Sequence, residues 1–443
     1  MEDLRIFVII SHMPEEVSVI TLFFKNLTDY LKTKRKVKMI WLVSQPEKIS
    51  NIPQENSEDI ILDIHDFDNA VDAMKQTKPH LVYCEETYEF RHYASLIAAK
   101  FLKIPVFGGY GAEIPFQIKK KTIWISYFKR FFQSSIPTQK KQKKQFMKRG
   151  RYFFYKYNFL ANTQKAIGQN YKKIIQDFFM FLNFWMRPNS LPTSAGHVPI
   201  DVRFVCDLHW VENKKLFDLL IREGYDKNTL FVTGDPKYDH TIRKIKSIKN
   251  RNKEEEIKVL FVTSNLYEHG FWSKQRRDYV IKNIVKEIIR NKKRVSLKIK
   301  IHPTNENILE YQEIINKIDP SIEIIQKGEF LEQLYDSDIV VSFPAGASVC
   351  TYTTIARKPL LICNFFNDKW LFLEKKIATE CKDPVNLMQN IEEALKNNPQ
   401  MLKRIEDFVH ESLYKDDGLS SKRFGDELIN YLEKNQKNVK NEN

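Results

Sequence analysis

Short apolar strand patterns alternate with amphipathic helical patterns along this 443-residue chain, and this alternation limits the possible folds more than any other feature. Parallel strands need crossover connections, so strand–helix alternation at this spacing predicts a right-handed, doubly wound α/β sheet. The first series has strand patterns at 5–10, 37–43, 59–64, 80–84 and 104–109, and helical patterns at 14–31, 68–77 and 88–102. The same rhythm resumes with strands at 202–206 and 230–234 and a helix at 212–223.

A second series follows the charged, glycine-free segment 244–256. Its strand patterns are at 258–264, 295–301, 322–325, 338–342 and 359–364, and its helical patterns are at 274–291, 306–317, 329–336 and 347–357. We therefore predict two Rossmann-like domains that face a central cleft, followed by a C-terminal helix and polar tail; their bounds are 1–243, 244–418 and 419–443. Ligands of such sheets bind outside the carboxyl ends of the strands.

The positive charge of the chain is concentrated in one segment. The formal net charge is +15, yet the stretch from Ile114 to Gln176 holds 16 Lys and Arg and neither Asp nor Glu. The remaining residues are close to neutral, with 55 basic and 56 acidic side chains. We expect residues 114–200 to form a basic, aromatic, helical insert in the first domain.

Residues 114–186 of this insert interleave lysines with aromatic side chains, which suits an anionic membrane surface. A basic groove for single-stranded nucleic acid is a rival interpretation that we place last. A third is a helical insert whose aromatics pack on their own domain. No apolar run approaches the roughly 20 residues of a membrane-spanning helix, and the acidic N-terminus does not resemble a signal peptide. We expect a cytoplasmic protein, peripheral on the inner face of the membrane.

No resident metal or cofactor is expected from the sequence. The five cysteines lie far apart without a CxxC pair, which favours reduced thiols over a zinc site or a disulfide framework. Asp336 and Asp338 could hold a divalent ion. However, they join a predicted helix to the amino end of a strand, opposite the expected ligand edge.

The strand predicted at 295–301 ends at His302-Pro303. Pro303 restricts the preceding residue to extended geometry, which fixes the direction of the imidazole. Thr304 or Asn305 can cap the next helix, whose first free N–H groups favour an anion. His302 is therefore a candidate donor to a phosphate oxygen; the alternative is a histidine that merely ends a strand at the surface.

A second candidate loop follows the strand that ends at Ser342. Small residues, including Gly346 and Ala347, let the backbone approach a ligand, and the start of the next helix offers unpaired N–H groups. Ser342 and Ser348 add hydroxyls. The alternative is a tight turn that only serves packing. Together, the two strand ends suggest a diphosphate site.

Transfer chemistry also needs a base for the acceptor hydroxyl. Glu113 and His12 follow strands of the first domain and are our candidate bases; Glu113 could instead be a helix cap. In the second domain, Ser264, Glu268 and His269 follow strand 258–263 and could touch the donor, or could form an ordinary polar loop.

Several segments occur in the order seen in a group of GT-B transferases: LFVTGDPKYD (230–239), KIHP ending at Pro303, the 342–348 loop and DDGLSSKRFGDEL (416–428). With AAKFLKIPVFGGYGAE (98–113), they resemble the CDP-glycerol glycerophosphotransferase and polysialyltransferase group, and more distantly the non-hydrolysing UDP-N-acetylglucosamine 2-epimerases.

This resemblance implies a GT-B fold in which His302 contacts the donor diphosphate and the 342–348 loop binds phosphate or nucleotide. Asp417, Gly418 and Ser421 would belong to a closing C-terminal element. The expected function is a metal-independent glycosyltransferase that moves a sugar from a nucleotide-activated donor to a glycan or lipid-linked acceptor in surface polysaccharide biosynthesis. A CDP-polyol phosphotransferase, an enzyme like the UDP-GlcNAc 2-epimerases, and a non-catalytic membrane-surface or RNA-binding protein remain alternatives.

Overall fold

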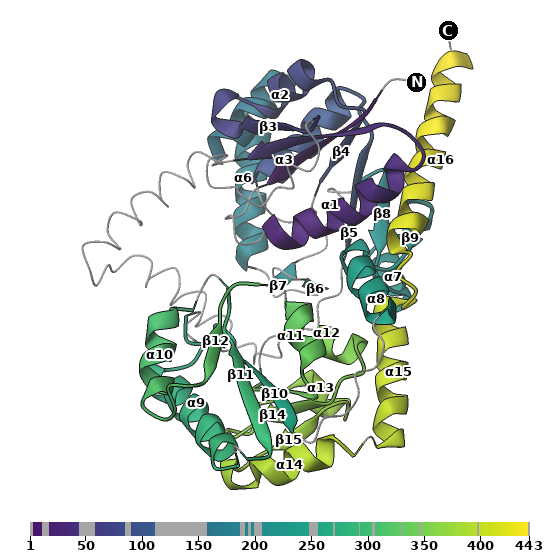
Figure 1. Cartoon of the computed structure of the whole chain (residues 1–443). Helices are drawn as coiled ribbons and strands as arrows, with labels where there is room; N and C mark the ends of the chain where they lie inside the picture. Colours follow the sequence, from purple (N-terminus) through teal and green to yellow (C-terminus); the bar gives the residue numbers. More distant parts are fainter. Residues whose placement is uncertain are drawn as a thin grey trace, which may run out of the picture. The chain divides into compact units, whose positions relative to one another are not determined.

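The computed structural model describes residues 3–10, 17–43, 58–84, 90–110, 157–186, 191–193, 196–198, 206–247, 256–268, 271–291, 293–303, 306–328, 330–344, 347–396 and 398–441. Described residues up to 240 and from 411 onward form one compact unit, and those from 241 to 410 form another (Figure 1). Residues 244–247, predicted as the start of a linker, instead continue helix α8 (Asp239–Ser247). Helix α16 (Ser420–Asn441), predicted as a separate segment, belongs to the first unit.

The first unit contains a sheet of seven parallel strands in the order β3-β2-β1-β4-β5-β8-β9. The strands are β1 (Leu4–Ile10), β2 (Val37–Val43), β3 (Ile60–Asp63), β4 (Leu81–Tyr83), β5 (Val106–Tyr110), β8 (Leu208–Val211) and β9 (Leu230–Val232). The main helices of this unit, besides α16, are α1 (Val17–Lys32), α2 (Ala70–Thr77), α3 (Phe90–Phe101), α6 (Tyr171–Met186) and α7 (Lys214–Arg222).

Both faces of this sheet are buried against helices. Successive side chains of a strand point to opposite faces, so neighbouring residues belong to different clusters. Phe7 and Ile9 of β1 pack with α2 and α3 on one face. Ile6 and Val8 pack on the other face, in the cluster that holds buried residues of α1 and α16. This arrangement explains why the strands read as continuous apolar runs rather than as alternating patterns.

One strand of this sheet was not predicted: β8, from Leu208 to Val211. The strand predicted at 202–206 lies outside the described residues except for Cys206, which is not in a strand. All four β8 residues are buried. His209 in its middle is fully buried and its Nε2 accepts the N–H of Cys206 at 3.3 Å. A polar residue inside a buried strand interrupts the apolar pattern, so the sequence pattern did not indicate β8.

The segments 230–239 and 416–428 meet in the first unit. The two carboxylate oxygens of Asp239 accept the backbone N–H groups of Ser420 and Ser421 at 2.9 and 2.6 Å, at the start of α16. Gly234 has φ +81°, and a Cβ there would lie 2.5 Å from Ser420 Oγ. Further along α16, Phe424 and Leu428 are buried in the core shared with α1. These segments therefore attach the last helix to the first unit.

The second unit contains six parallel strands in the order β12-β11-β10-β13-β14-β15. They are β10 (Ile257–Val262), β11 (Val295–Lys300), β12 (Glu323–Ile325), β13 (Ile339–Ser342), β14 (Leu360–Cys363) and β15 (Thr379–Cys381). Its helices include α9 (Lys274–Ile289), α10 (Ile308–Asn316), α11 (Phe330–Asp336), α12 (Ala347–Ile355), α13 (Leu371–Glu374), α14 (Leu387–Ala394) and most of α15 (Pro399–Leu413).

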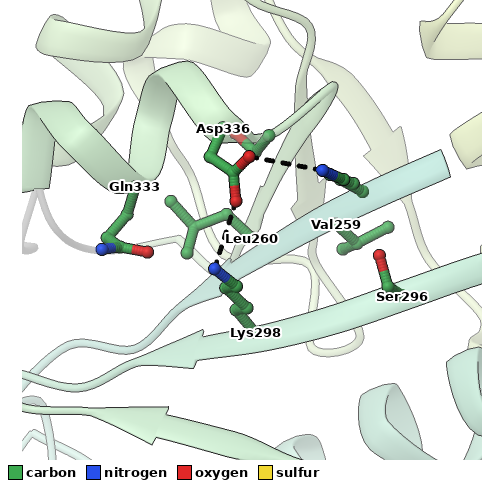
Figure 2. A pocket seen from close by; sticks show the side chains of 8 residues that line it. Val259, Leu260, Ser296, Lys298, Gln333 and Asp336 are labelled. Atoms are coloured by element: carbon green, nitrogen blue, oxygen red, sulfur yellow. Dashed lines mark hydrogen bonds and ion pairs between the residues drawn. The ribbon is translucent and has the colours of Figure 1, made fainter. Parts of the chain in front are cut away.

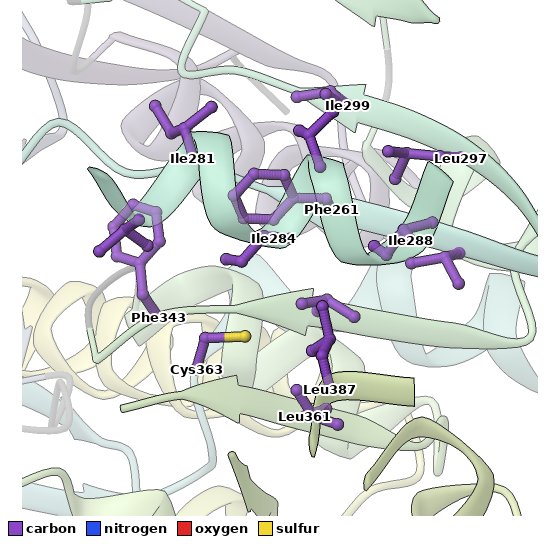
Figure 3. Packing of buried hydrophobic residues seen from close by; sticks show 14 of the residues in the cluster. Phe261, Ile281, Ile284, Ile288, Leu297, Ile299, Phe343, Leu361, Cys363 and Leu387 are labelled. Carbon is purple, nitrogen blue, oxygen red and sulfur yellow. The ribbon is translucent and has the colours of Figure 1, made fainter. Parts of the chain in front are cut away.

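The core of the second unit lies between this sheet and its covering helices. Phe261 of β10 and Ile299 of β11 are fully buried against Ile281, Ile284 and other residues of α9 (Figure 3). Along the chain, β11 and β12 lie on one side of β10, and the later strands β13, β14 and β15 lie on the other side. This reversal places a topological switch point between β10 and β13, where ligands of doubly wound sheets bind. The predicted fold class, two doubly wound α/β units, is confirmed.

Part of the predicted insert lies within the described residues. It includes helix α6 and a short antiparallel hairpin of β6 (Leu191–Thr193) and β7 (Gly196–Val198). Residues 111–156 lie outside the described part of the chain. Among the described helices, none is long and apolar enough to cross a membrane.

Candidate functional site

The carboxyl edge of the second sheet brings together the segments that the sequence marked. Strands β11 and β13 flank β10 on either side. Strand β11 ends at Lys300, β10 at Val262 and β13 at Ser342. Because neighbouring strands are about 4.8 Å apart, the ends of β11 and β13 lie roughly 10 Å from each other. The chain just after each end can therefore contact one small ligand.

His302 lies two residues beyond β11, at the edge where we predicted it. The residue is half-buried, and its backbone N–H donates to a carboxylate oxygen of Glu306 at 2.5 Å. Helix α10 begins at Ile308, with Asn307 as its N-cap. Neither Thr304 nor Asn305, both outside the described residues, is the cap.

Glu306 is the centre of a buried polar network at this edge, and its side chain is 2% exposed. Its carboxylate accepts hydrogen bonds from the hydroxyls of Thr263, which follows β10, and Tyr311, which lies in α10. Burial raises the pKa of Glu306 above its usual value, although the hydrogen bonds from Thr263, Tyr311 and His302 act in the opposite direction.

Arg277 of α9 lies beside this network, with its guanidinium 5.4 Å from the ring centroid of Tyr311. Its guanidinium lies 4.4 Å from the ring centroid of Tyr267 and donates to Glu310 at 2.8 Å and to Glu268 at 3.4 Å. Glu268, one of the predicted donor contacts, thus has an arginine partner, and burial raises the pKa of its carboxyl group. Ser264 is buried, with 7% of its surface exposed.

The serines of the 342–348 loop have different environments. Ser342 is 1% exposed, and its hydroxyl donates to the carbonyl oxygen of Val262 at 3.1 Å. That bond joins β13 to β10. Ser348 is exposed in the first turn of α12, which begins at Ala347. Gly346 lies outside the described residues.

Three other predicted site residues also lie outside the described part of the chain: His12, Glu113 and His269. Their assignment as candidate bases or donor contacts remains a prediction from the sequence.

A pocket of about 150 Å³ lies at the other edge of the same sheet, near the amino ends of β10 and β11 (Figure 2). Asp336 lines it, 3.1 Å from Lys298 Nζ and 3.4 Å from Lys258 Nζ. Burial acts to raise the pKa of Asp336, but the two lysines outweigh it and hold that pKa below its usual value. The carboxylate proposed as a possible metal ligand is thus neutralised by two ammonium groups. The described residues contain no cluster of three or more His, Cys, Asp or Glu suited to a metal ion.

Solved structures that match nearly the whole chain include UDP-N-acetylglucosamine 2-epimerases. A Listeria monocytogenes protein assigned as such an enzyme is 12% identical, with a TM-score of 0.55 over 98% of each chain. The S. aureus MnaA–UDP structure is 14% identical, with a TM-score of 0.52 over 97% of each chain. The chain has the GT-B fold.

The structure of the Neisseria meningitidis UDP-GlcNAc 2-epimerase with bound UDP-GlcNAc is 13% identical, with a TM-score of 0.51. The match covers 96% of this GT-B chain and 100% of the epimerase chain. Likeness at such identities concerns the fold and not the reaction. No protein-family model matches the sequence, and no curated protein matches it. The predicted GT-B fold is confirmed, whereas the resemblance to CDP-glycerol transferases remains a prediction.

Sequence reasoning about this GT-B site missed Glu306 and Arg277. The first was taken as an early residue of a helix, and the second was one of many charges in a helical pattern. The available signal was spacing: Glu306 and Tyr311 follow a strand-ending histidine by four and nine positions. Spacing alone does not distinguish a buried carboxylate from an exposed one.

Proposed function

We propose that the chain is a glycosyltransferase that binds a nucleoside diphosphate sugar at the carboxyl edge of the second sheet. The observation that carries this proposal is that His302 and the α12 N-terminus follow the two strands that flank β10. The ends of these two strands lie roughly 10 Å apart, which suits groups that contact opposite sides of a diphosphate.

In the proposed mechanism, the imidazole of His302 donates to a diphosphate oxygen. Free N–H groups at the start of α12, and the hydroxyl of Ser348, offset further negative charge on the departing nucleotide. Glu113 or His12 of the first unit serves as the base for the acceptor hydroxyl. The nucleotide sugar is a substrate, and the scheme uses no resident metal or cofactor.

Sugar 2-epimerisation is the second candidate, because structural neighbours with TM-scores above 0.5 include UDP-GlcNAc 2-epimerases. The two candidates differ in what they need. A transferase consumes its donor only when an acceptor or water takes the sugar. An epimerase interconverts a UDP-sugar with no acceptor present.

NMR of reaction mixtures separates these reactions. UDP-GlcNAc, CDP-glycerol, GDP-mannose and a CMP-sugar are incubated with the protein, with and without a lipid extract as acceptor source. We expect acceptor-dependent release of the free nucleotide from one sugar donor, and its loss in His302→Ala. A 2-epimer formed without acceptor supports the second candidate, and CMP released from CDP-glycerol supports a polyol-phosphate transferase. If every donor stays intact under all conditions, the proposed function is wrong.

We further propose that the acceptor is reached at an anionic membrane surface, on the cytoplasmic side, through helix α6. Tyr171, Ile175 and Phe179 recur at four-residue spacing on this helix and are 73%, 52% and 62% exposed. Lys172 and Lys173 lie beside this stripe on the exposed surface. An apolar stripe bordered by lysines is complementary to anionic lipid headgroups and the acyl boundary below them.

A further inference from the structure

The loops that follow β10 and β11 are tied to helix α10 by a single buried carboxylate. Glu306 accepts hydrogen bonds from the Thr263 hydroxyl after β10, the His302 N–H after β11 and the Tyr311 hydroxyl in α10. With 2% of its surface exposed, Glu306 has no access to a ligand of its own. Its contacts are instead with the segment that carries the predicted phosphate donor.

A second set of hydrogen bonds holds the same loop from the side of β12. The Gln326 side-chain amide donates to the carbonyl oxygens of Glu306 at 2.7 Å and of His302 at 3.4 Å. Beneath it, Lys300 is 5% exposed and its Nζ donates to the carbonyl oxygen of Gln326 at 2.7 Å. Residues 302 and 306 are therefore held through side-chain and backbone groups together.

We propose that Glu306 is a positioning residue that fixes the backbone of His302, so that the imidazole meets the ligand in one orientation. This inference rests on the proposed nucleotide-sugar function. Glu306 acts through His302 and does not touch the substrate.

The position of the carboxylate supports a role beyond stability. Burying a carboxylate carries a desolvation cost, so a well-packed apolar residue of similar size is often at least as stabilising. A buried polar network with its hydrogen bonds made does, however, define one geometry. Here that geometry includes the residue immediately before Pro303, whose own ring further restricts the loop.

Two variants test the proposal by UDP titration. In Glu306→Ala the His302 N–H loses its acceptor, and we expect UDP affinity to fall at least tenfold while circular dichroism stays unchanged. Glu306→Gln keeps one carbonyl oxygen for that N–H, and its amide can donate to the Tyr311 oxygen, so affinity should stay within about threefold of wild type. Glu313→Gln, an exposed change on the same helix at a residue paired with Lys317, is the matched control and should bind like wild type.

A double variant shows whether Glu306 acts through His302. If it does, Glu306→Ala combined with His302→Ala binds UDP no more weakly than His302→Ala alone. Additive losses would overturn the proposal. If Glu306→Ala does not fold, Glu306→Asp, which keeps the charge but shortens the reach, takes its place in the cycle.

Amide hydrogen exchange gives a readout that needs no nucleotide. The His302 N–H should exchange at least 100-fold faster in Glu306→Ala or Glu306→Asp than in wild type, and at a near wild-type rate in Glu306→Gln. An unchanged exchange rate would overturn the positioning role. If wild type protects this N–H but binds none of the nucleotides, the proposed function fails and the structural part of the inference stands.

Discussion

Asp417 and Arg423 form an ion pair at the start of α16. Arg423 donates to both carboxylate oxygens of Asp417, at 3.0 and 2.8 Å, and its Nε donates to the Thr233 carbonyl oxygen at 2.8 Å. The same carboxylate accepts the N–H of Leu419. The resemblance implied that Asp417 belongs to a closing C-terminal element. In the structure its contacts lie within the first unit and hold the last helix to the end of β9.

The stability contributed by Asp417 should depend on pH. Burial acts to raise the pKa of Asp417, but the hydrogen bonds from Arg423 and Leu419 outweigh it and lower that pKa. A lowered folded-state pKa gives stability that is complete above the unfolded pKa of about 3.9 and is lost as pH falls through the folded value. We expect Asp417→Asn to reduce the free energy of unfolding by about 1 kcal/mol at pH 7.

Urea denaturation at pH 7 and at pH 3.5 checks this prediction. The difference between wild type and Asp417→Asn should shrink at the lower pH. Glu433→Gln, an exposed change on the same helix, should be neutral at both. A difference between wild type and Asp417→Asn that does not vary with pH would contradict the assigned role.

A site residue was predictable from the sequence when it had a ligand-binding side chain and also lay at the end of a strand. His302 meets both conditions, because a strand with period-two alternation leads directly to a histidine before proline. Ser342 lies at the end of β13, but its hydroxyl donates within the sheet. Glu306 could not be found, because its three donors come from three separate elements that only the fold brings together.

The strands and helices themselves were largely predictable, because most of them are short, strongly patterned and bounded by polar turns. Strand β8 was missed, because the buried polar residue His209 interrupts its apolar pattern. The end of α8 was predicted as the start of a linker, because Lys244 and Lys246 lead into a longer run of charged residues.

The exposed apolar stripe of helix α6 leads to a prediction about binding to lipid vesicles. If its exposed stripe enters an anionic membrane surface, the protein should sediment with vesicles that contain phosphatidylglycerol and much less with pure phosphatidylcholine vesicles. Replacing Ile175 and Phe179 by Asp removes apolar area and adds negative charge, so we expect at least a tenfold weaker association. Higher salt should weaken the wild-type association as well.

Gln176→Ala, on the exposed side of the same helix, is the matched control for vesicle binding and should sediment like wild type. Equal sedimentation of the double Asp variant and wild type would refute α6 as the docking helix. If wild type binds phosphatidylcholine vesicles as strongly as vesicles that contain phosphatidylglycerol, the proposal that the membrane surface is anionic is wrong.

At the scale of the whole molecule, the two units repeat one topology. Each sheet starts near its middle, extends to one side and then reverses, giving corresponding strand orders in the two units. The alternation along the sequence was sufficient to predict this architecture, because parallel strands accept few connections. That the two units face a central cleft stays a prediction from the sequence.

The central claim is that a nucleoside diphosphate binds at the carboxyl edge of the second sheet, beside His302. Calorimetric titration of UDP, CDP and GDP into wild type, His302→Ala and Lys298→Ala tests it directly. Lys298 lies on the same strand but contacts the pocket at the opposite edge. The account predicts that one nucleotide binds wild type and Lys298→Ala alike, and binds His302→Ala about tenfold or more weakly, as expected for a lost hydrogen bond to a charged group. Equal affinity of wild type and His302→Ala, or no binding of any nucleotide to wild type, would contradict it.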